Sequence, residues 1–256
     1  MGAKLTAIPS ARRSRGTETD FPAKDAPLPD APPPDSVDLR RAWQAVPDQG
    51  RTASCVGWSV AESLRWYLVE KERLAQDQPL SPRHIWMAAK ETDQRTDYPS
   101  TFLEEDGTSL KAGLDVVRKF GAVLESELPW AGGLVAGSPE DFNRSAGSRR
   151  IVSYFNLGDD SVPDRSVHFD GWRRWLAHSG PVVVLLQVDK NLDRATLGAF
   201  DEASADGSHA AALFGYGPDH FLLRSSWGPD WGDGGYARMS LGYAARAVIE
   251  SYGVIV

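Results

Sequence analysis

The residue best suited to covalent chemistry is Cys55, the single cysteine of the 256-residue chain. It follows Ser54 where a helical pattern begins, and a helix N-terminus favours negative charge and lowers the pKa of a thiol. A nucleophilic thiol also needs a base, usually a histidine from another element. Spacing alone leaves open which histidine would serve, and whether Cys55 is instead buried filler. The five candidates are His84, His168, His178, His209 and His220.

The elements that must position these residues fall into two groups, helices first and strands later. Ser54 is a predicted N-cap, and the apolar residues after it recur at helical spacing. Further helices are expected from Ser81-Pro82, from Thr108-Ser109 to a stop at Gly121, and around Trp172. The predicted buried face of the helix from Ser109 holds Leu110, Leu114, Val117 and Phe120.

Buried or alternating apolar runs in the last third of the chain predict strands. Glycine-rich turns at 217–219 and 232–235 separate several of them. Helices followed by strands indicate an α+β fold with a helical lobe and a β lobe. The predicted strands are 181–188, 209–216, 220–224, 235–239 and 247–256.

The first 36 residues differ from the rest. Seven of the 17 prolines lie there, Pro32-Pro33-Pro34 closes the segment, and apolar periodicity is absent. This composition predicts a disordered, proline-rich tail over residues 1–36. The segment matches neither a Sec nor a twin-arginine signal. Residues 37–256 form the predicted globular domain, mainly helical over about 37–150 and mainly β over about 151–256.

Composition excludes several function classes. Hydrophobic residues make up 41% and charged residues 25% of the chain, near the average for soluble proteins. The formal net charge of −7 argues against a nucleic-acid-binding surface. No apolar run has the length that a membrane span requires. One cysteine excludes an internal disulfide and favours a reducing, cytoplasmic compartment. No histidine pair has convincing metal spacing, so neither metal nor cofactor is expected.

Three short sequence motifs resemble those of the papain-like cysteine peptidases, including bacterial members, and occur in the same order as in that family. Asp48-Gln49-Gly50 precedes Ser54-Cys55 at the start of a long helix, and Gly207-Ser208-His209-Ala210 resembles the histidine strand of that family. The run from Arg224 to Tyr236, with Ser226-Trp227-Gly228, resembles its Asn-Ser-Trp-Gly segment. The resemblance runs from about residue 37 to the C-terminus, and the three motifs together are highly specific.

The resemblance implies a papain-like two-lobe α+β fold, with a β-barrel-like second lobe and the active-site cleft between the lobes. It assigns Cys55 as nucleophile and His209 as general base and acid. It assigns Gln49 as a donor to the oxyanion, beside the backbone N–H of Cys55. Trp227 would shield the histidine from water. Gly107 and Ser208 would contribute, with Trp227, to substrate binding.

Two departures from the family pattern bear on activity and compartment. Ser225 stands where the family has the Asn that accepts a hydrogen bond from the histidine. A hydroxyl accepts such a bond but is shorter, so contact should need a backbone shift or a water. Thr52 replaces the cysteine usually found three residues before the nucleophile, which suits a reducing compartment.

The resemblance therefore predicts a thiol endopeptidase acting on a protein or peptide substrate. Two alternatives stay open: an acyl transferase or deamidase using the same atoms, and a catalytically impaired peptide-binding module in which Ser225 marks the loss. The long inhibitory prosegment of the family is not evident, so control by a regulatory partner, by location or by the tail is expected. The bacterial-type motifs also allow the hypothesis that the protein is an effector, delivered into a host, that cleaves one chosen protein. A tail lying along the cleft would act as a self-inhibitor.

Overall fold

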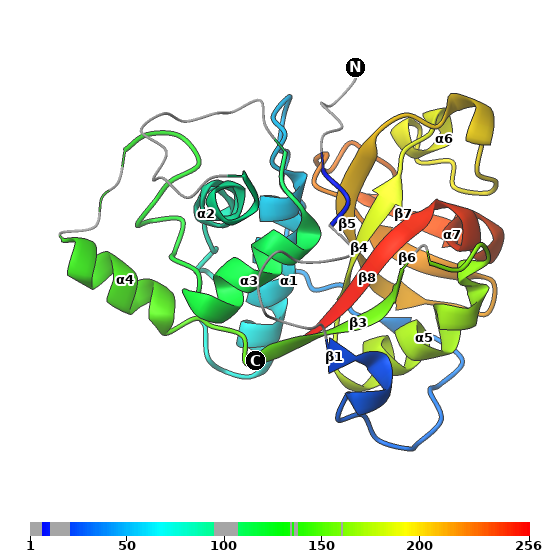
Figure 1. Cartoon of the computed structure of the whole chain (residues 1–256), viewed down its shortest axis with the longest axis horizontal. Helices are drawn as coiled ribbons and strands as arrows, with labels where there is room; N and C mark the ends of the chain where they lie inside the picture. The colour runs from blue at the N-terminus through cyan, green and yellow to red at the C-terminus, as the bar shows by residue number, and fades with distance from the viewer. Residues whose placement is uncertain (1–6, 11–20, 95–106, 134, 136–137, 160) are drawn as a thin grey trace.

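The structure, a computed structural model, describes residues 7–10, 21–94, 107–133, 135, 138–159 and 161–256. Figure 1 shows a helical lobe on one side and a sheet with its own helices on the other. The helical lobe holds α1 (Cys55–Glu70), α2 (Pro82–Gln94), α3 (Leu110–Lys119) and α4 (Pro139–Gly147). The β lobe holds α5 (Phe169–His178), α6 (Lys190–Asp193), α7 (Leu241–Ala247) and the 3-10 turns Ala23–Asp25, Arg165–His168 and Glu202–Ser204.

One sheet organises the β lobe. Its strands run in the order β1-β3-β8-β4-β5-β6-β7, with β2 paired to β5, and every pairing is antiparallel except that of β1 with β3. The predicted α+β fold, with a helical lobe and a β lobe, is therefore confirmed. The strands are β1 (Phe21–Pro22), β2 (Val37–Asp38), β3 (Ser153–Asp159), β4 (Val182–Gln187), β5 (Ser208–Tyr216), β6 (His220–Arg224), β7 (Tyr236–Ser240) and β8 (Val248–Ile255).

The lobes share a continuous hydrophobic core, and α1 is its central helix. Both α1 and α5 pack against β4 and β5. The indole N–H of Trp175 donates to the Tyr67 hydroxyl, which donates to the Pro181 carbonyl. A Cβ at Gly253 would lie 2.1 Å from the Trp175 ring, so only glycine lets the aromatic ring meet β8 this closely. These contacts fix α1, and hence its first residue, against the sheet.

Most predicted element starts are found, but some local predictions were wrong. The Ser54 side chain makes no capping hydrogen bond, whereas the Ser109 hydroxyl accepts from the Ala112 N–H at the start of α3. Phe120, expected on the buried face, is 56% exposed because α3 ends at Lys119. Sequence periodicity also missed α4, α7 and β3. One partner strand of β3 is β8, near the C-terminal end of the chain.

The described parts of the N-terminal 36 residues make specific contacts with the domain, although most of them are exposed. Phe21 and Pro22 pair with β3, and Tyr216 donates to the Pro34 carbonyl. Ala7 is 6% exposed. Residues 7–10, termed here the covering segment, appear in Figure 1 as a blue stretch between the two lobes. The described residues thus contact the domain at specific points, whereas the sequence predicted a disordered tail over residues 1–36.

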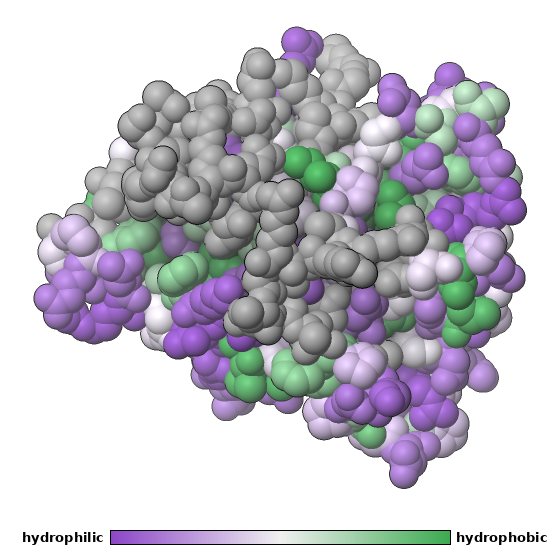
Figure 2. Space-filling view, in the orientation of Figure 1, coloured by the Kyte–Doolittle hydropathy of each residue, from purple (hydrophilic) through white to green (hydrophobic). Residues whose placement is uncertain are grey.

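The surface can be described by the hydropathy of its residues. On the face seen in Figure 2, hydrophobic side chains of described residues lie in small groups among hydrophilic ones. No helix in the described part of the chain is both long enough and apolar enough to cross a membrane.

Candidate active site

Cys55 is the first residue of α1 and is fully buried. Burial raises the pKa of its thiol to about 11, because a thiolate loses hydration there. Hydrogen bonding by the backbone of Ala210, Val56, Cys55 and Ala7 acts in the opposite direction, but less strongly. The helix start therefore supplies the backbone groups that favour a thiolate, while burial holds the thiol protonated in this conformation.

His209 lies near the start of β5, between a hydroxyl and an indole ring. Its Nε2 is 3.1 Å from the Ser225 Oγ, and its ring centroid is 4.3 Å from that of Trp227. The other ring nitrogen, Nδ1, has no hydrogen-bond partner among the described residues. Burial lowers the pKa of His209 to about 3, because the imidazolium would be poorly solvated. The imidazole is thus neutral in this state and has one nitrogen left for proton exchange.

Ser225 reaches the histidine directly, without the water-mediated link that the shorter side chain suggested. It follows β6, and its backbone N–H donates to the Gly235 carbonyl. This bond ties the residue to the turn before β7. Ser225 is 4% exposed, so its hydroxyl is sheltered from competing water. The hydroxyl therefore stands where an orienting group for the His209 ring would act.

Gln49 is held beside this group by a residue that sequence reasoning gave no role. The Ser226 hydroxyl donates to Gln49 Oε1 at 2.6 Å, and the Gln49 backbone N–H donates to the Ser226 carbonyl. Gln49 Nε2 donates to the Thr52 carbonyl at 2.9 Å, leaving its second N–H for another acceptor. Ser226 thus fixes which way the amide faces. The motif around Trp227 contained Ser226, but only the fold shows that it contacts Gln49.

Thr52, at the position of the absent cysteine, joins the same loop by hydrogen bonds. Its hydroxyl donates to the Gln49 carbonyl at 2.8 Å and lies 2.6 Å from the Ser54 Oγ. The short side chain therefore stabilises the turn between Gln49 and Cys55 without a covalent link. This arrangement explains why Ser54 does not cap α1, because its hydroxyl faces the loop.

Of the three predicted substrate-binding positions, Ser208 contacts the covering segment and Gly107 lies next to a residue that does. Ser208 Oγ donates to the Ala7 carbonyl at 3.1 Å, and the Ala7 N–H donates to the Ser208 carbonyl. On the helical lobe, the Ile8 N–H donates to the carbonyl of Thr108, the residue after Gly107. Gly107 itself is buried at the same edge. The chain's own backbone therefore bridges the lobes directly beside Cys55 and His209.

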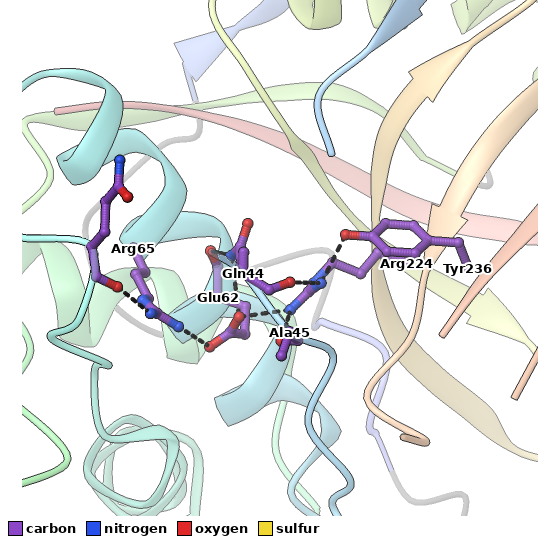
Figure 3. A network of polar contacts seen from close by, with 7 residues as sticks. Gln44, Ala45, Glu62, Arg65, Arg224 and Tyr236 are labelled. Atoms are coloured by element: carbon purple, nitrogen blue, oxygen red, sulfur yellow. Dashed lines mark hydrogen bonds and ion pairs between the residues drawn. The ribbon is translucent and has the colours of Figure 1, made fainter. Parts of the chain in front are cut away.

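A buried polar network joins the lobes a short distance deeper (Figure 3). Arg224 on β6 donates to Glu62 Oε2 on α1 at 2.7 Å, and also to the Gln44 and Ala45 carbonyls and the Tyr236 hydroxyl. Arg65 lies 3.8 Å from the other Glu62 oxygen. Both side chains of the Arg224–Glu62 pair are less than 10% exposed.

This network is aligned with the candidate catalytic residues. Ser59 and Glu62 lie four and seven residues after Cys55, on the same face of α1. Ser59 donates to the Ala211 carbonyl, two residues after His209, and Glu62 pairs with Arg224, next to Ser225. One helix face thus carries the thiol and fixes both strands that hold its partners.

The other histidines lie away from this site. His84 is half-buried and packs edge-on against Phe142, and desolvation lowers its pKa to about 4. His168 packs on Trp172, His178 contacts the Ala31 carbonyl, and His220 pairs with Asp219. Among the described residues no group of three His, Cys, Asp or Glu side chains is placed to hold a metal ion.

A family model described as "Papain family cysteine protease" matches residues 33–256, which is most of the chain. The chain belongs to the papain family of cysteine proteases. A cathepsin L-like proteinase of Fasciola hepatica is 22% identical over 80% of this chain and 60% of its own length. Papain of Carica papaya is 46% identical over 46 residues, 18% of this chain and 12% of that protein. The chain therefore spans less than two thirds of the curated relatives it matches.

Solved structures of papain-family proteins share the fold over nearly the whole chain. Xylellain, a cysteine protease from Xylella fastidiosa, superposes with a TM-score of 0.78 at 20% identity, covering 99% of this chain and 96% of xylellain. The Carica candamarcensis cysteine protease CMS1MS2, solved with E-64, gives a TM-score of 0.62 at 20% identity, covering 87% and 98%. At these identities the superpositions show the common fold.

Proposed function

We propose that this papain-family chain is a thiol endopeptidase with Cys55 as nucleophile and His209 as general base and acid. The observation that carries the proposal is the meeting of residues 49–55 with His209 and Ser225, which lie more than 150 positions further along the chain. The site brings together Cys55 at the start of α1, the loop of Gln49, His209 at the start of β5 and Ser225 after β6. The Ser225 hydroxyl lies 3.1 Å from the His209 ring. Such an arrangement of nucleophile, base and orienting group suits acyl transfer.

The proposed reaction follows from these positions. Nδ1 of His209 takes the Cys55 proton, and the thiolate attacks the scissile carbonyl to form a tetrahedral intermediate. The second N–H of Gln49 and the Cys55 N–H stabilise its oxyanion, while His209 protonates the leaving amine. Water activated by His209 then hydrolyses the thioester. Ser225 keeps the ring oriented throughout by accepting from Nε2–H.

The described conformation represents the latent form of this enzyme. Ala7 covers the site, the thiol has a pKa of about 11 and the imidazole a pKa of about 3, so both groups are neutral near pH 7. Departure of the covering segment would hydrate the pair and favour the thiolate–imidazolium form. We therefore propose that residues 7–10 restrain the enzyme, in place of an external inhibitory partner.

The test is hydrolysis of an internally quenched peptide by the full chain and by Ser10→Pro, which removes an N–H that holds the covering segment. Cys55→Ala and His209→Ala should each lower kcat/KM by about 1000-fold or more. His220→Ala, a half-buried histidine outside the site, is the matched control and should keep the wild-type rate. Equal activity in Cys55→Ala would contradict the proposal.

The same assay distinguishes the remaining alternatives. With an added amine, a hydrolase yields mainly the free carboxylate, whereas an acyl transferase yields the amide, and mass spectrometry separates the two products. A binding module without catalysis would retain peptide and release neither product. The contacts of Gln49 and His209, together with Cys55, favour a catalytic role over a binding module, and the assay decides whether water or an amine is the acceptor.

We further propose that the enzyme works in a reducing, cytoplasmic compartment, either of its own cell or of a host in which it cleaves one dedicated protein. The support is its single thiol and the hydrogen bonds of Thr52 where relatives carry a cysteine. Fractionation of cells that express the tagged chain tests the location. Mass spectrometry of cleaved host proteins tests the choice of substrate, since many unrelated products would contradict a dedicated role.

A further inference from the structure

A cavity on the β lobe is lined by none of the residues of the proposed active site. Its volume is about 420 Å³, within the range of small-molecule sites. It is lined from the 3-10 turn Arg165–His168, from the end of β4 and the loop that follows, and from α7, which packs against that turn. In Figure 1, α7 lies on the side of the β lobe that faces away from the helical lobe. The cavity therefore forms only once these distant segments have folded together.

Two guanidinium groups line this cavity, and the first belongs to Arg165. Its Nη1 donates to the Pro163 carbonyl at 2.7 Å, which holds the side chain in place. Its Nε is buried and has no hydrogen-bond partner among the described residues. A buried N–H without an acceptor costs free energy, so an acceptor on a ligand would be favourable there.

The second guanidinium group, that of Arg246 on α7, already holds a carboxylate at the cavity. Arg246 forms an ion pair with Glu202 of the 3-10 turn Glu202–Ser204, and the two side chains are 58% and 62% exposed. An ion pair exposed to this degree contributes little to stability, because water screens it. Asp164, another acid near Arg246, accepts from the Ser166 N–H at 2.9 Å and so caps its own turn. A ligand carboxylate would therefore displace only the Glu202 carboxylate, at little cost.

Most of the remaining lining is apolar. Pro163, Phe200 and Ala205 line the cavity, and the Phe200 ring packs edge-on against Tyr243 with the ring centroids 5.5 Å apart. Tyr243 is fully buried, so it holds the Phe200 ring in a fixed position. Gln187, at the end of β4, adds an amide that can donate or accept. A preformed apolar wall beside cationic groups suits a ligand with an apolar body and an acidic group.

We propose that this cavity binds a ligand that carries a carboxylate on an apolar body, either a small aromatic or aliphatic acid or the C-terminal residue of a peptide. Arg165 and Arg246 bind the carboxylate, because planar guanidinium donors match its two oxygens. Phe200 and Pro163 contact the apolar body. Glu202 is the internal competitor that pairs with Arg246 while no ligand is bound. The site lies outside the proposed peptidase machinery, so the inference does not depend on that function.

The test titrates hydrocinnamate into the isotope-labelled full chain and follows the arginine Nε–H signals by NMR. The signals of Arg165 and Arg246, assigned through variants, should shift with a Kd on the order of 1 mM, as expected for so small a ligand. Hydrocinnamamide, which lacks the charge, should bind roughly 10-fold more weakly or worse. N-acetyl-alanyl-phenylalanine and its C-terminal amide repeat the comparison for a peptide end. The tighter of the two acids identifies the source of the carboxylate.

The variants should change the affinity for hydrocinnamate in opposite directions. Arg165→Gln and Arg246→Gln should each weaken binding by roughly 10-fold or more, since each removes a charge-assisted hydrogen bond. Glu202→Gln should strengthen binding, because the competing carboxylate is gone. Arg144→Gln is the matched control and should bind like the wild type, because it breaks a similarly exposed ion pair with Glu140 on α4.

Three outcomes would overturn the inference. The first is equal binding of each acid and its amide, or no shift of any arginine signal up to about 10 mM of either acid. The second is unchanged affinity in both arginine variants when their circular dichroism is native. The third is weaker binding in Glu202→Gln, which would mean that Glu202 is not the competitor. None of these outcomes bears on the peptidase proposal, because the readout is binding rather than cleavage.

Discussion

Two regions join the helical lobe to the β lobe, and they differ in chemistry. At Glu62 and Arg224 the joint is a buried charge pair with neighbouring donors and acceptors. At the covering segment it is a set of backbone bonds to Ser208 and Thr108, with a side-chain bond at Glu250. The first joint consists of side chains inside the domain, whereas the second is made by a separate stretch of chain.

This difference indicates which of the two contacts between the lobes stays closed: the Arg224–Glu62 contact is the permanent joint, and the covering segment is the replaceable joint. A buried ion pair cannot open without stranding a charge, so Arg224 keeps β6 and Ser225 at a fixed distance from α1. Backbone bonds are made equally well by any extended peptide, so the covering segment is replaceable by a substrate. Under the proposed function, the contact at Arg224 and Glu62 would set the geometry of catalysis, and the covering segment would set access to it.

The largest expected effect comes from breaking the permanent joint. Arg224→Ala leaves Glu62 buried without its main partner and removes the donors to Gln44, Ala45 and Tyr236. The free energy of unfolding should fall by about 3–5 kcal/mol, as measured by urea titration. The control Arg41→Ala breaks the pair with Glu70 on the same helix, where both side chains are about 30% exposed, and should cost about 1 kcal/mol or less. Similar losses in the two variants would contradict a special role for the buried pair.

The next prediction concerns the alkylation rate of Cys55, which reports how well the covering segment shields the thiol. With a pKa of about 11 the Cys55 thiol is protonated below that pH, so iodoacetamide should react slowly at pH 7 and faster as pH rises towards 11. Compared with an ordinary thiol of pKa near 8.5, the thiolate fraction at pH 7 is lower by roughly 300-fold. The rate is followed by the mass shift, and the urea-unfolded chain provides the ordinary thiol. A folded chain as reactive at pH 7 as the unfolded one would show that the site is open.

A smaller effect is expected from the hydroxyl that the permanent joint positions. Ser225→Ala removes the acceptor 3.1 Å from His209 Nε2, so the ring loses orientation and kcat should fall by roughly tenfold with little change in KM. Ser225→Thr keeps a hydroxyl and should restore most of the rate. Steady-state kinetics on one peptide distinguishes the variants. A rise in KM alone would place Ser225 in substrate binding.

The smallest effect comes from weakening the replaceable joint at one bond. Ser208→Ala deletes the hydroxyl that donates to the Ala7 carbonyl but keeps the backbone contacts of residue 208. The covering segment should leave more often, raising the alkylation rate of Cys55 at pH 7 by a few-fold, roughly the worth of one neutral hydrogen bond. Unchanged alkylation would show that the hydroxyl does not restrain the segment.

Much of the fold was predictable because its signals are local. The helical spacing after Ser54, Pro82 at a helix start and the apolar run of β4 each arise within a few residues, and the elements lie where they were expected. Phe120 and the short elements α4, α7 and β3 were not predictable in this way. The exposure of Phe120 depends on where α3 ends, and the place of β3 depends on β8, a partner distant in the chain.

For the candidate site, the sequence by itself determined the reactive residue types. Cys55 lies at a helix start, and the motifs around Gln49, His209 and Trp227 identified the family to which the chain belongs. It could not determine that Ser225 reaches His209, that Ser226 orients Gln49, or that Ala7 covers the thiol.

Only the tertiary structure decided these contacts, because each joins residues between 16 and 201 positions apart. It also decided the protonation state. The same thiol and imidazole would titrate near ordinary values in an open chain, and burial between the lobes holds both neutral. Residue identity set the chemistry available to this protein, and packing set when that chemistry is exposed.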